Sequence, residues 1–107
     1  MIYKLFDQAE VIRSKNSGPY ELTFDIIFKD AAHFEAFVAK NVMTASIFAN
    51  LYNIAEGDVQ SVIAFAPAKA VKVTIIRPMS SGALGERDIY VAQQHGILTG
   101  FQYKLDL

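Results

Sequence analysis

The feature that most constrains this chain is a run of ten residues, 20–29, in which apolar and mostly polar side chains alternate. The apolar positions are Tyr20, Leu22, Phe24, Ile26 and Phe28, and the positions between them are Glu21, Thr23, Asp25, Ile27 and Lys29. A period of two predicts a β-strand with one apolar face, which is typical of an antiparallel sheet that is covered on one side only. The chain is therefore expected to build a one-sided antiparallel sheet.

The helices that cover this sheet are expected directly after the strand. Asp30 is suited to cap a first helix, whose buried stripe would consist of Phe34, Phe37 and Val38. Thr44 is suited to cap a second helical stretch, with Ile47, Leu51 and Ile54 on one face. The pattern fits two helices as well as one kinked helix.

Three further strands complete the pattern. Val59–Ala66 and Lys69–Arg77 are rich in β-branched residues and are joined through Pro67, which predicts a hairpin. A last strand is predicted from Phe101, where apolar and polar residues alternate again up to Asp106. The first dozen residues fit a helical turn and an edge strand equally well.

The order of these elements predicts the fold class. Strand, helices, strand, strand, helix and strand are arranged most compactly as an α+β domain with the ferredoxin-like split βαβ topology. This topology has a four-stranded antiparallel sheet with helices on one face. With 107 residues, of which 52% are hydrophobic, the chain is expected to form one domain over residues 1–107.

Composition excludes several classes of protein. A net charge of -1 argues against binding to nucleic acid or to an anionic membrane surface. The chain has no cysteine, so disulfides and thiolate chemistry are excluded, and two histidines without metal-ligand spacing predict no metal site. No cofactor is expected. No stretch approaches the roughly 20 apolar residues of a membrane span, so we expect a cytoplasmic protein that does not enter a membrane.

The topology predicts a candidate ligand site where two polar loops meet. Because the strand from Tyr20 would lie antiparallel to the strand that ends at Arg77, the loop 13–19 and the loop 77–87 would converge. These loops carry Arg13, Ser14, Lys15, Asn16, Ser17, Arg77, Ser80, Ser81 and Arg87. Guanidinium groups and the start of a short helix, predicted over 88–94 and stopped by Gly96, favour a small anionic ligand, which His95 could help to orient. The alternative is that these residues only form turns and surface ion pairs.

Three other positions have simpler predictions. His33 is expected to face solvent or to assist the cap at Asp30. Asp25 is expected on the open face of the sheet, in an ion pair with Lys72 or Lys104. The aromatic residues Phe34, Phe37 and Phe48 are expected in the core.

Several segments together resemble a known family. They are Arg13-Ser14-Lys15-Asn16-Ser17-Gly18-Pro19, the strand Glu21–Phe28, Asp88-Ile89-Tyr90 and Gln93-Gln94-His95. They are similar to the AtuA-like ferredoxin-fold family of small proteins, which resemble the C-terminal region of the larger acyclic terpene utilisation protein A. In the larger protein the first segment is of the type Arg-Ser-Gly-Asp-Lys-Gly, whereas Lys15 and Asn16 stand here in place of the glycine and the aspartate. The resemblance implies a companion of such a larger protein and brings no activity with it.

Three classes of function follow from these observations. The first is an accessory or small subunit of a catabolic system that acts on acyl or carboxylate compounds, as a homo-oligomer or in complex with a larger AtuA-like protein. The second is a stand-alone sensor of a small molecule. The third is a small enzyme on acyl or carboxylate substrates, in which Arg13 and Arg77 would hold charge and His95 or Asp88 would move protons.

Overall fold

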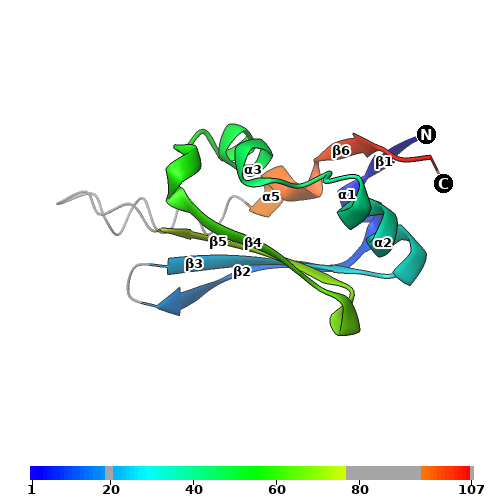
Figure 1. Cartoon of the computed structure of the whole chain (residues 1–107), viewed down its shortest axis with the longest axis horizontal. Helices are drawn as coiled ribbons and strands as arrows, with labels where there is room; N and C mark the ends of the chain where they lie inside the picture. Colours follow the sequence, from blue (N-terminus) through cyan, green and yellow to red (C-terminus); the bar gives the residue numbers. More distant parts are fainter. Residues whose placement is uncertain (19–20, 77–94, 107) are drawn as a thin grey trace.

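A four-stranded antiparallel sheet forms one layer of the molecule (Figure 1). The computed structural model describes residues 1–18, 21–76 and 95–106. The strands lie in the order β2-β3-β5-β4, and every neighbouring pair is antiparallel. Their bounds are β2 Ala9–Gly18, β3 Glu21–Phe28, β4 Val59–Phe65 and β5 Ala70–Ile76.

The predicted central strand is confirmed as β3. Its apolar side chains point toward the helical layer and are almost fully buried; these are Leu22, Phe24, Ile26 and Phe28. Alternate residues therefore pack into the core, while the residues between them lie on the other face of the sheet. The predicted hairpin is also confirmed, because β4 and β5 pair directly and are joined by a 3₁₀ turn over Ala66–Ala68.

All the described helices lie on one face of the sheet, as predicted (Figure 1). α2 spans Ala31–Ala39, and the Asp30 carboxylate accepts a hydrogen bond from the His33 N–H at 2.9 Å. α3 spans Ala45–Tyr52 and is capped in the same way by Thr44, at 3.2 Å from the Ile47 N–H. These are two separate helices, because Asn41 adopts the left-handed conformation (φ 51°) between them.

The opening residues form both of the structures that the sequence allowed. β1 spans Ile2–Lys4, α1 spans Leu5–Gln8, and β2 begins at Ala9. At the other end of the chain, α5 spans His95–Thr99. Gly96 lies inside this helix. The short helix predicted over residues 88–94, with Gly96 as its stop, lies outside the described part of the chain.

The last strand does not join the main sheet. β6, Gln102–Lys104, pairs with β1 in a separate two-stranded antiparallel sheet, with Tyr3 opposite Tyr103. The edge position that the last strand would occupy in the split βαβ arrangement is taken by β2. The α+β class and the four-stranded antiparallel sheet are confirmed, and the helices of the described residues lie on one face of it, whereas the ferredoxin-like topology is not confirmed.

The core lies between the sheet and the helices and is strongly aromatic. The Phe24 ring contacts the Phe48 ring at 5.0 Å between centroids, and the Phe28 ring contacts the Phe37 ring at 4.8 Å. Phe34, Phe37 and Phe48 are all buried, which confirms the predicted aromatic stripe. Such ring pairs add to the burial of apolar area, so they fix how α2 and α3 sit on β3. No described helix is long and apolar enough to cross a membrane.

Candidate functional site

The face of the main sheet that points away from the helices is organised in rows of cross-strand neighbours. One row crosses all four strands and consists of Arg13 on β2, Asp25 on β3, Lys72 on β5 and Ile63 on β4. The row beside it is polar and consists of Lys15, Thr23, Thr74 and Ser61. On its other side, toward the β4–β5 hairpin, the row is apolar and consists of Val11, Ile27, Ala70 and Phe65. We call this surface the open face.

A buried carboxylate lies at the centre of the open face. The Arg13 Nε donates a hydrogen bond to Asp25 Oδ2 at 3.0 Å, and the Lys15 Nζ lies 3.9 Å from the same oxygen. The Asp25 side chain is only 2% exposed, whereas those of Arg13 and Lys15 are 55% and 53% exposed. Burial of an ionised carboxylate is costly unless it is paired, so Arg13 provides the interaction that allows Asp25 to lie there.

The second oxygen of this carboxylate is less well satisfied. Asp25 Oδ1 is buried and has no hydrogen-bond partner among the described residues. In the next row the Thr23 and Thr74 hydroxyls lie 3.3 Å apart and hydrogen bond to each other. The middle of the open face therefore holds one acceptor oxygen in need of a donor.

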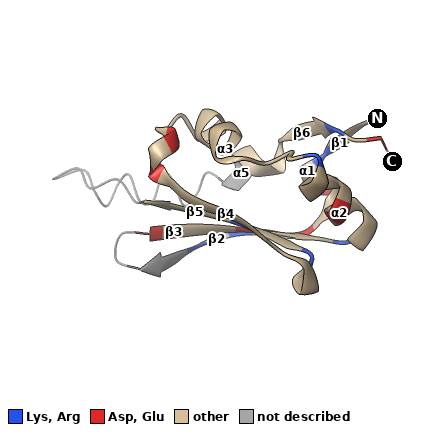
Figure 2. Ribbon diagram, viewed as in Figure 1, with Lys and Arg blue, Asp and Glu red and all other residues tan. Residues whose placement is uncertain are grey.

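Positive charge exceeds negative charge in this part of the open face. Lys72 is exposed and lies opposite Asp25 in the register, yet it makes no ion pair within 4.0 Å of another described residue. Figure 2 shows the basic and acidic positions side by side in the middle of the sheet. Asp25 was expected to pair with Lys72 or Lys104. Its observed partners are Arg13 and, at a longer distance, Lys15, and Lys104 lies on β6 in the other sheet.

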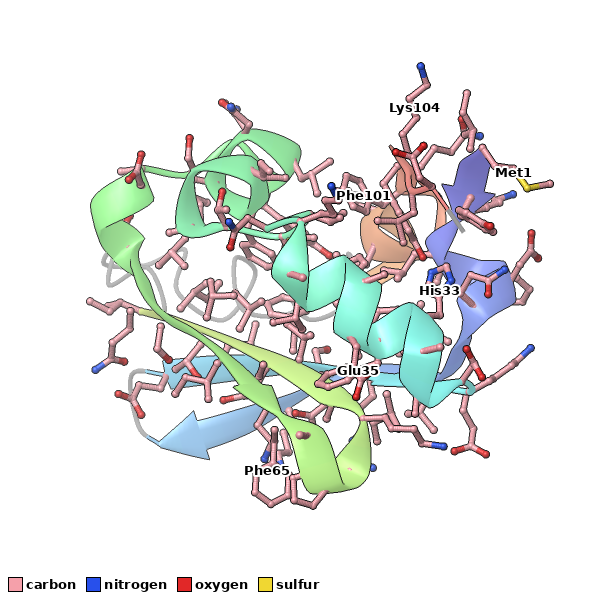
Figure 3. The ribbon with its side chains drawn as sticks, turned by 45° about the vertical axis from the view of Figure 1, so that its right-hand side comes forward. Met1, His33, Glu35, Phe65, Phe101 and Lys104 are labelled. Atoms are coloured by element: carbon pink, nitrogen blue, oxygen red, sulfur yellow. The ribbon has the colours of Figure 1, made fainter. Side chains whose placement is uncertain are left out.

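The open face also exposes large apolar side chains. Ile63, Phe65 and Ile76 are 55%, 51% and 42% exposed, and all three lie on this side of the sheet. Figure 3 shows the Phe65 ring pointing away from the helical layer. Exposed apolar side chains that gather on one face, beside charged groups, are typical of surfaces that bind another molecule.

The structure places only part of the predicted ligand site. The segment 13–18 was expected to be a loop, but it is the second half of strand β2, paired with β3. Arg13 and Lys15 lie on the open face, and Ser14 lies on the opposite face, in register with Phe24. Asn16 and Ser17 also belong to this strand. The loop prediction was wrong because β3 supplies backbone partners as far as Gly18, which the polar composition of the segment did not indicate.

The second half of the predicted site lies outside the described residues. This applies to Arg77, Ser80, Ser81 and Arg87, and to the whole stretch 77–94. The expected register is nevertheless confirmed as far as Ile76, which pairs with Glu21 at the start of β3. His95 opens α5 in the helical layer, across the sheet from the open face, so the structure does not bring His95 to Arg13.

A second polar pair is buried in the helical layer and was not predicted. His33 is 4% exposed, and its Nε2 lies 2.6 Å from the Tyr103 hydroxyl, which joins α2 to β6. The Tyr3 ring packs edge-on against the His33 ring, with 4.9 Å between the ring centroids. His33 is labelled in Figure 3. His33 was expected to face solvent or to assist the cap at Asp30. Its side chain is buried instead, and its backbone N–H donates the hydrogen bond to the capping carboxylate of Asp30. The missed signal is its spacing of four residues from Phe37, which puts both on one helix face.

Burial sets the proton chemistry of this pair. Loss of solvent lowers the pKa of His33 below its ordinary value of 6.5, and the Asp30 carboxylate only partly opposes this. Burial also raises the pKa of Tyr103, with a smaller contribution from Tyr3 in the same direction. Both groups are therefore neutral at physiological pH, and their hydrogen bond contributes to stability rather than to the movement of charge.

Other features of the described residues do not add a site. A cavity of about 470 cubic Å lies beside β6, lined in part by Lys40, Phe101 and Lys104. The buried polar side chain in its wall, Tyr103, is already hydrogen bonded to His33. Within the described ranges, no three His, Asp or Glu side chains lie close enough to hold a metal ion.

Comparison with known proteins assigns the family of the chain. A family model described as a domain of unknown function (DUF4387) matches residues 5–102. No curated protein and no solved structure gives a significant match. The AtuA-like resemblance is not confirmed by this match. Since the model covers most of the 107 residues, the chain belongs to the DUF4387 family.

Proposed function

We propose that this chain is a small accessory subunit that docks on a larger protein through the open face of its sheet. The observation that carries the proposal is the exposure of Ile63, Phe65 and Ile76 on a sheet face that no described helix covers. Burial of a large apolar side chain contributes roughly 1.5 to 3 kcal/mol when it is complete. These three side chains are about half exposed, so a partner gains only the remaining part from each of them.

The charges of the open face specify the partner further. A partner that fits has an apolar patch bordered by carboxylates, because Arg13 and Lys72 lie in the row next to the apolar row and Lys15 lies one row further away. Two copies of this chain stacked face to face bring these cations together, which costs energy. The open face is therefore better suited to a different protein than to itself. A carboxylate of the partner would accept a hydrogen bond from the Lys72 ammonium group. A hydroxyl or amide of the partner would donate a hydrogen bond to Asp25 Oδ1.

The partner that we propose is a larger AtuA-like protein in a catabolic system for acyl or carboxylate compounds. The basis for this step is the resemblance of the segments 13–19, 21–28, 88–90 and 93–95 to the AtuA-like ferredoxin-fold family. The open face is a separate line of support, since it calls for a protein partner whatever the pathway.

The test is co-expression of the chain with such a larger protein encoded beside it, followed by measurement of the mass of the purified material by light scattering. A stable complex is expected. Ile76→Lys should weaken the complex at least tenfold, because a charge replaces an apolar side chain on the open face. The sheet itself should tolerate this lysine, since Glu21 is its cross-strand neighbour and can pair with it. Phe6→Lys is the matched control, since Phe6 is exposed on α1 in the helical layer. Absence of a complex, or equal loss with both variants, contradicts the proposal.

A second candidate function is the binding of a small anion at the cationic row of the open face. It is favoured by three cationic side chains that surround a single carboxylate. The test is the melting temperature of the isolated protein with a short-chain carboxylate or an acyl thioester. A ligand that binds only the folded state raises this temperature, and Lys15→Ala should reduce the effect. An unchanged melting temperature with both probes excludes this candidate.

A further inference from the structure

The two edge strands of the main sheet differ in charge. β2, at one edge, carries Glu10, Arg13 and Lys15. β4, at the other edge, has the sequence Val-Gln-Ser-Val-Ile-Ala-Phe over residues 59–65, without a charge, a proline or a glycine. Natural sheets protect their edge strands with charged residues, proline or covering elements, because an open edge pairs readily with another strand. β4 has none of the sequence features that prevent such pairing.

The outer side of β4 is open in the described part of the chain. The ladder partner of β4 is β5, and no described element outside the sheet exchanges backbone hydrogen bonds with residues 60–65. Exposure rises from Ser61 onward, so that Ile63, Ala64 and Phe65 are all exposed. A register shift between Val59 and Ser61 limits regular pairing to the segment 61–65.

A strand that pairs with this edge finds apolar surface above and below it. Ile63 and Phe65 lie on the open face, as described above. Val62 and Ala64 lie on the helical side, where they line a small groove of about 110 cubic Å together with Val38 and Met43. Val38, which was expected in the buried stripe of α2, is in fact exposed beside this groove. An added strand would therefore bury apolar side chains on both of its faces.

We propose that β4 pairs antiparallel with β4 of a second copy of this chain. A two-fold axis then joins two four-stranded sheets into one continuous sheet of eight strands. An antiparallel pair of identical strands satisfies this symmetry, because each copy offers the same surface to the other. The second copy fits this edge because its own segment 61–65 is uncharged and is apolar on both faces, so no charge is buried at the junction.

This association is independent of what docks on the open face. The open faces of the two copies lie on the same side of the joined sheet and remain uncovered. Variants can therefore separate the two proposals: Ala64 lies at the edge and on the helical side, whereas Ile76 lies on β5 and on the open face.

The experiment measures the mass of the isolated protein by sedimentation and light scattering over tens to hundreds of micromolar. A subunit of 11.9 kDa should give twice that mass at the upper end of this range. Ala64→Lys should shift the protein to monomer, because lysine is a residue with which natural sheets block their edges. Phe6→Lys, which adds the same charge on exposed α1, should remain a dimer.

Hydrogen exchange identifies the surface involved. The amides of residues 61–65 that point away from β5 should become protected as the concentration rises in the wild type but not in Ala64→Lys, while β3 amides stay protected in both. Should Ala64→Lys not fold, Ile63→Glu replaces it, since Lys72 opposite can pair with the new carboxylate within the monomer. A monomer at every concentration, or a dimer that survives the folded edge variant, overturns the proposal.

Discussion

Arg13 and Asp25 form an ion pair across β2 and β3, with 3.0 Å between Nε and Oδ2, in which only the carboxylate is buried. The pair lies on the face of the sheet that no described helix covers. The pair joins an edge strand to a central strand and so stabilises the sheet, and its half-exposed guanidinium contributes positive charge to the open face. The stability of the fold and the character of the open face therefore depend on the same two residues.

Arg13→Ala should destabilise the fold by about 1 to 2 kcal/mol. Removal of one partner from a fully buried ion pair costs about 3 to 5 kcal/mol, and the smaller figure applies because Arg13 is half exposed and water can reach the carboxylate. Urea denaturation gives the free energy of unfolding. Lys15→Ala is the control, and its effect should stay below about 0.5 kcal/mol because Lys15 lies 3.9 Å from the oxygen. Equal effects of the two variants would show that Arg13 has no special role.

Stability should fall as the pH falls below 6.5, because of His33. Burial lowers the pKa of His33 in the folded state, so the unfolded chain binds this proton first, at the ordinary pKa of 6.5. The contribution of neutral His33 is complete above that pH and is lost between 6.5 and the lower pKa of the folded state. The measurement is the urea midpoint as a function of pH. His33→Gln should reduce this dependence, whereas His95→Gln, which removes the other histidine of the chain, should leave it in place.

Tyr103→Phe should destabilise the fold by about 1 to 3 kcal/mol. The substitution keeps the ring but leaves His33 Nε2 buried without its partner, and an unsatisfied buried polar group costs about that much. The double variant with His33→Phe tests the assignment, because removal of both polar groups should cost less than the sum of the single effects. Additive effects in thermal or urea denaturation would contradict a direct interaction between the two side chains.

Asp30→Ala and Thr44→Ala should each cost about 1 kcal/mol, since each removes the side chain that accepts a hydrogen bond at the start of a helix. Asp30→Asn should retain most of the stability, because asparagine caps helices nearly as well. The readout is again the free energy of unfolding. A loss with Asp30→Asn as large as with Asp30→Ala would point to the charge of Asp30 rather than to its hydrogen bond.

The parts of the fold that could be predicted are those that local physical rules decide. Alternation over ten residues predicted β3, because one face of that strand is buried along its whole length. Asp30 and Thr44 were recognised as caps because their side chains replace a missing backbone partner, which is a local requirement. The same alternation placed Asp25 on the open face.

The parts that could not be predicted depend on partners distant in the chain. β2 lacks a continuous apolar face in its second half, and it is a strand there because β3 provides its hydrogen bonds. β6 has three residues, and only its pairing with β1 decides which sheet it joins. His33 is buried because Tyr103, seventy positions later, supplies its hydrogen bond. Polar composition alone placed the segment 13–18 in a loop and His33 at the surface, and chain order alone placed the last strand in the main sheet.

The position of Asp25 on the face that no described helix covers links the strength of its ion pair with Arg13 to assembly. In the isolated chain, water reaches Arg13 and screens its attraction to the carboxylate. A protein that covers this side of the sheet expels that water, and the Coulomb attraction between the same two charges increases as the local dielectric falls. The sheet should therefore become more rigid at its β2 edge when it is covered, and the covered chain should resist salt better than the free one.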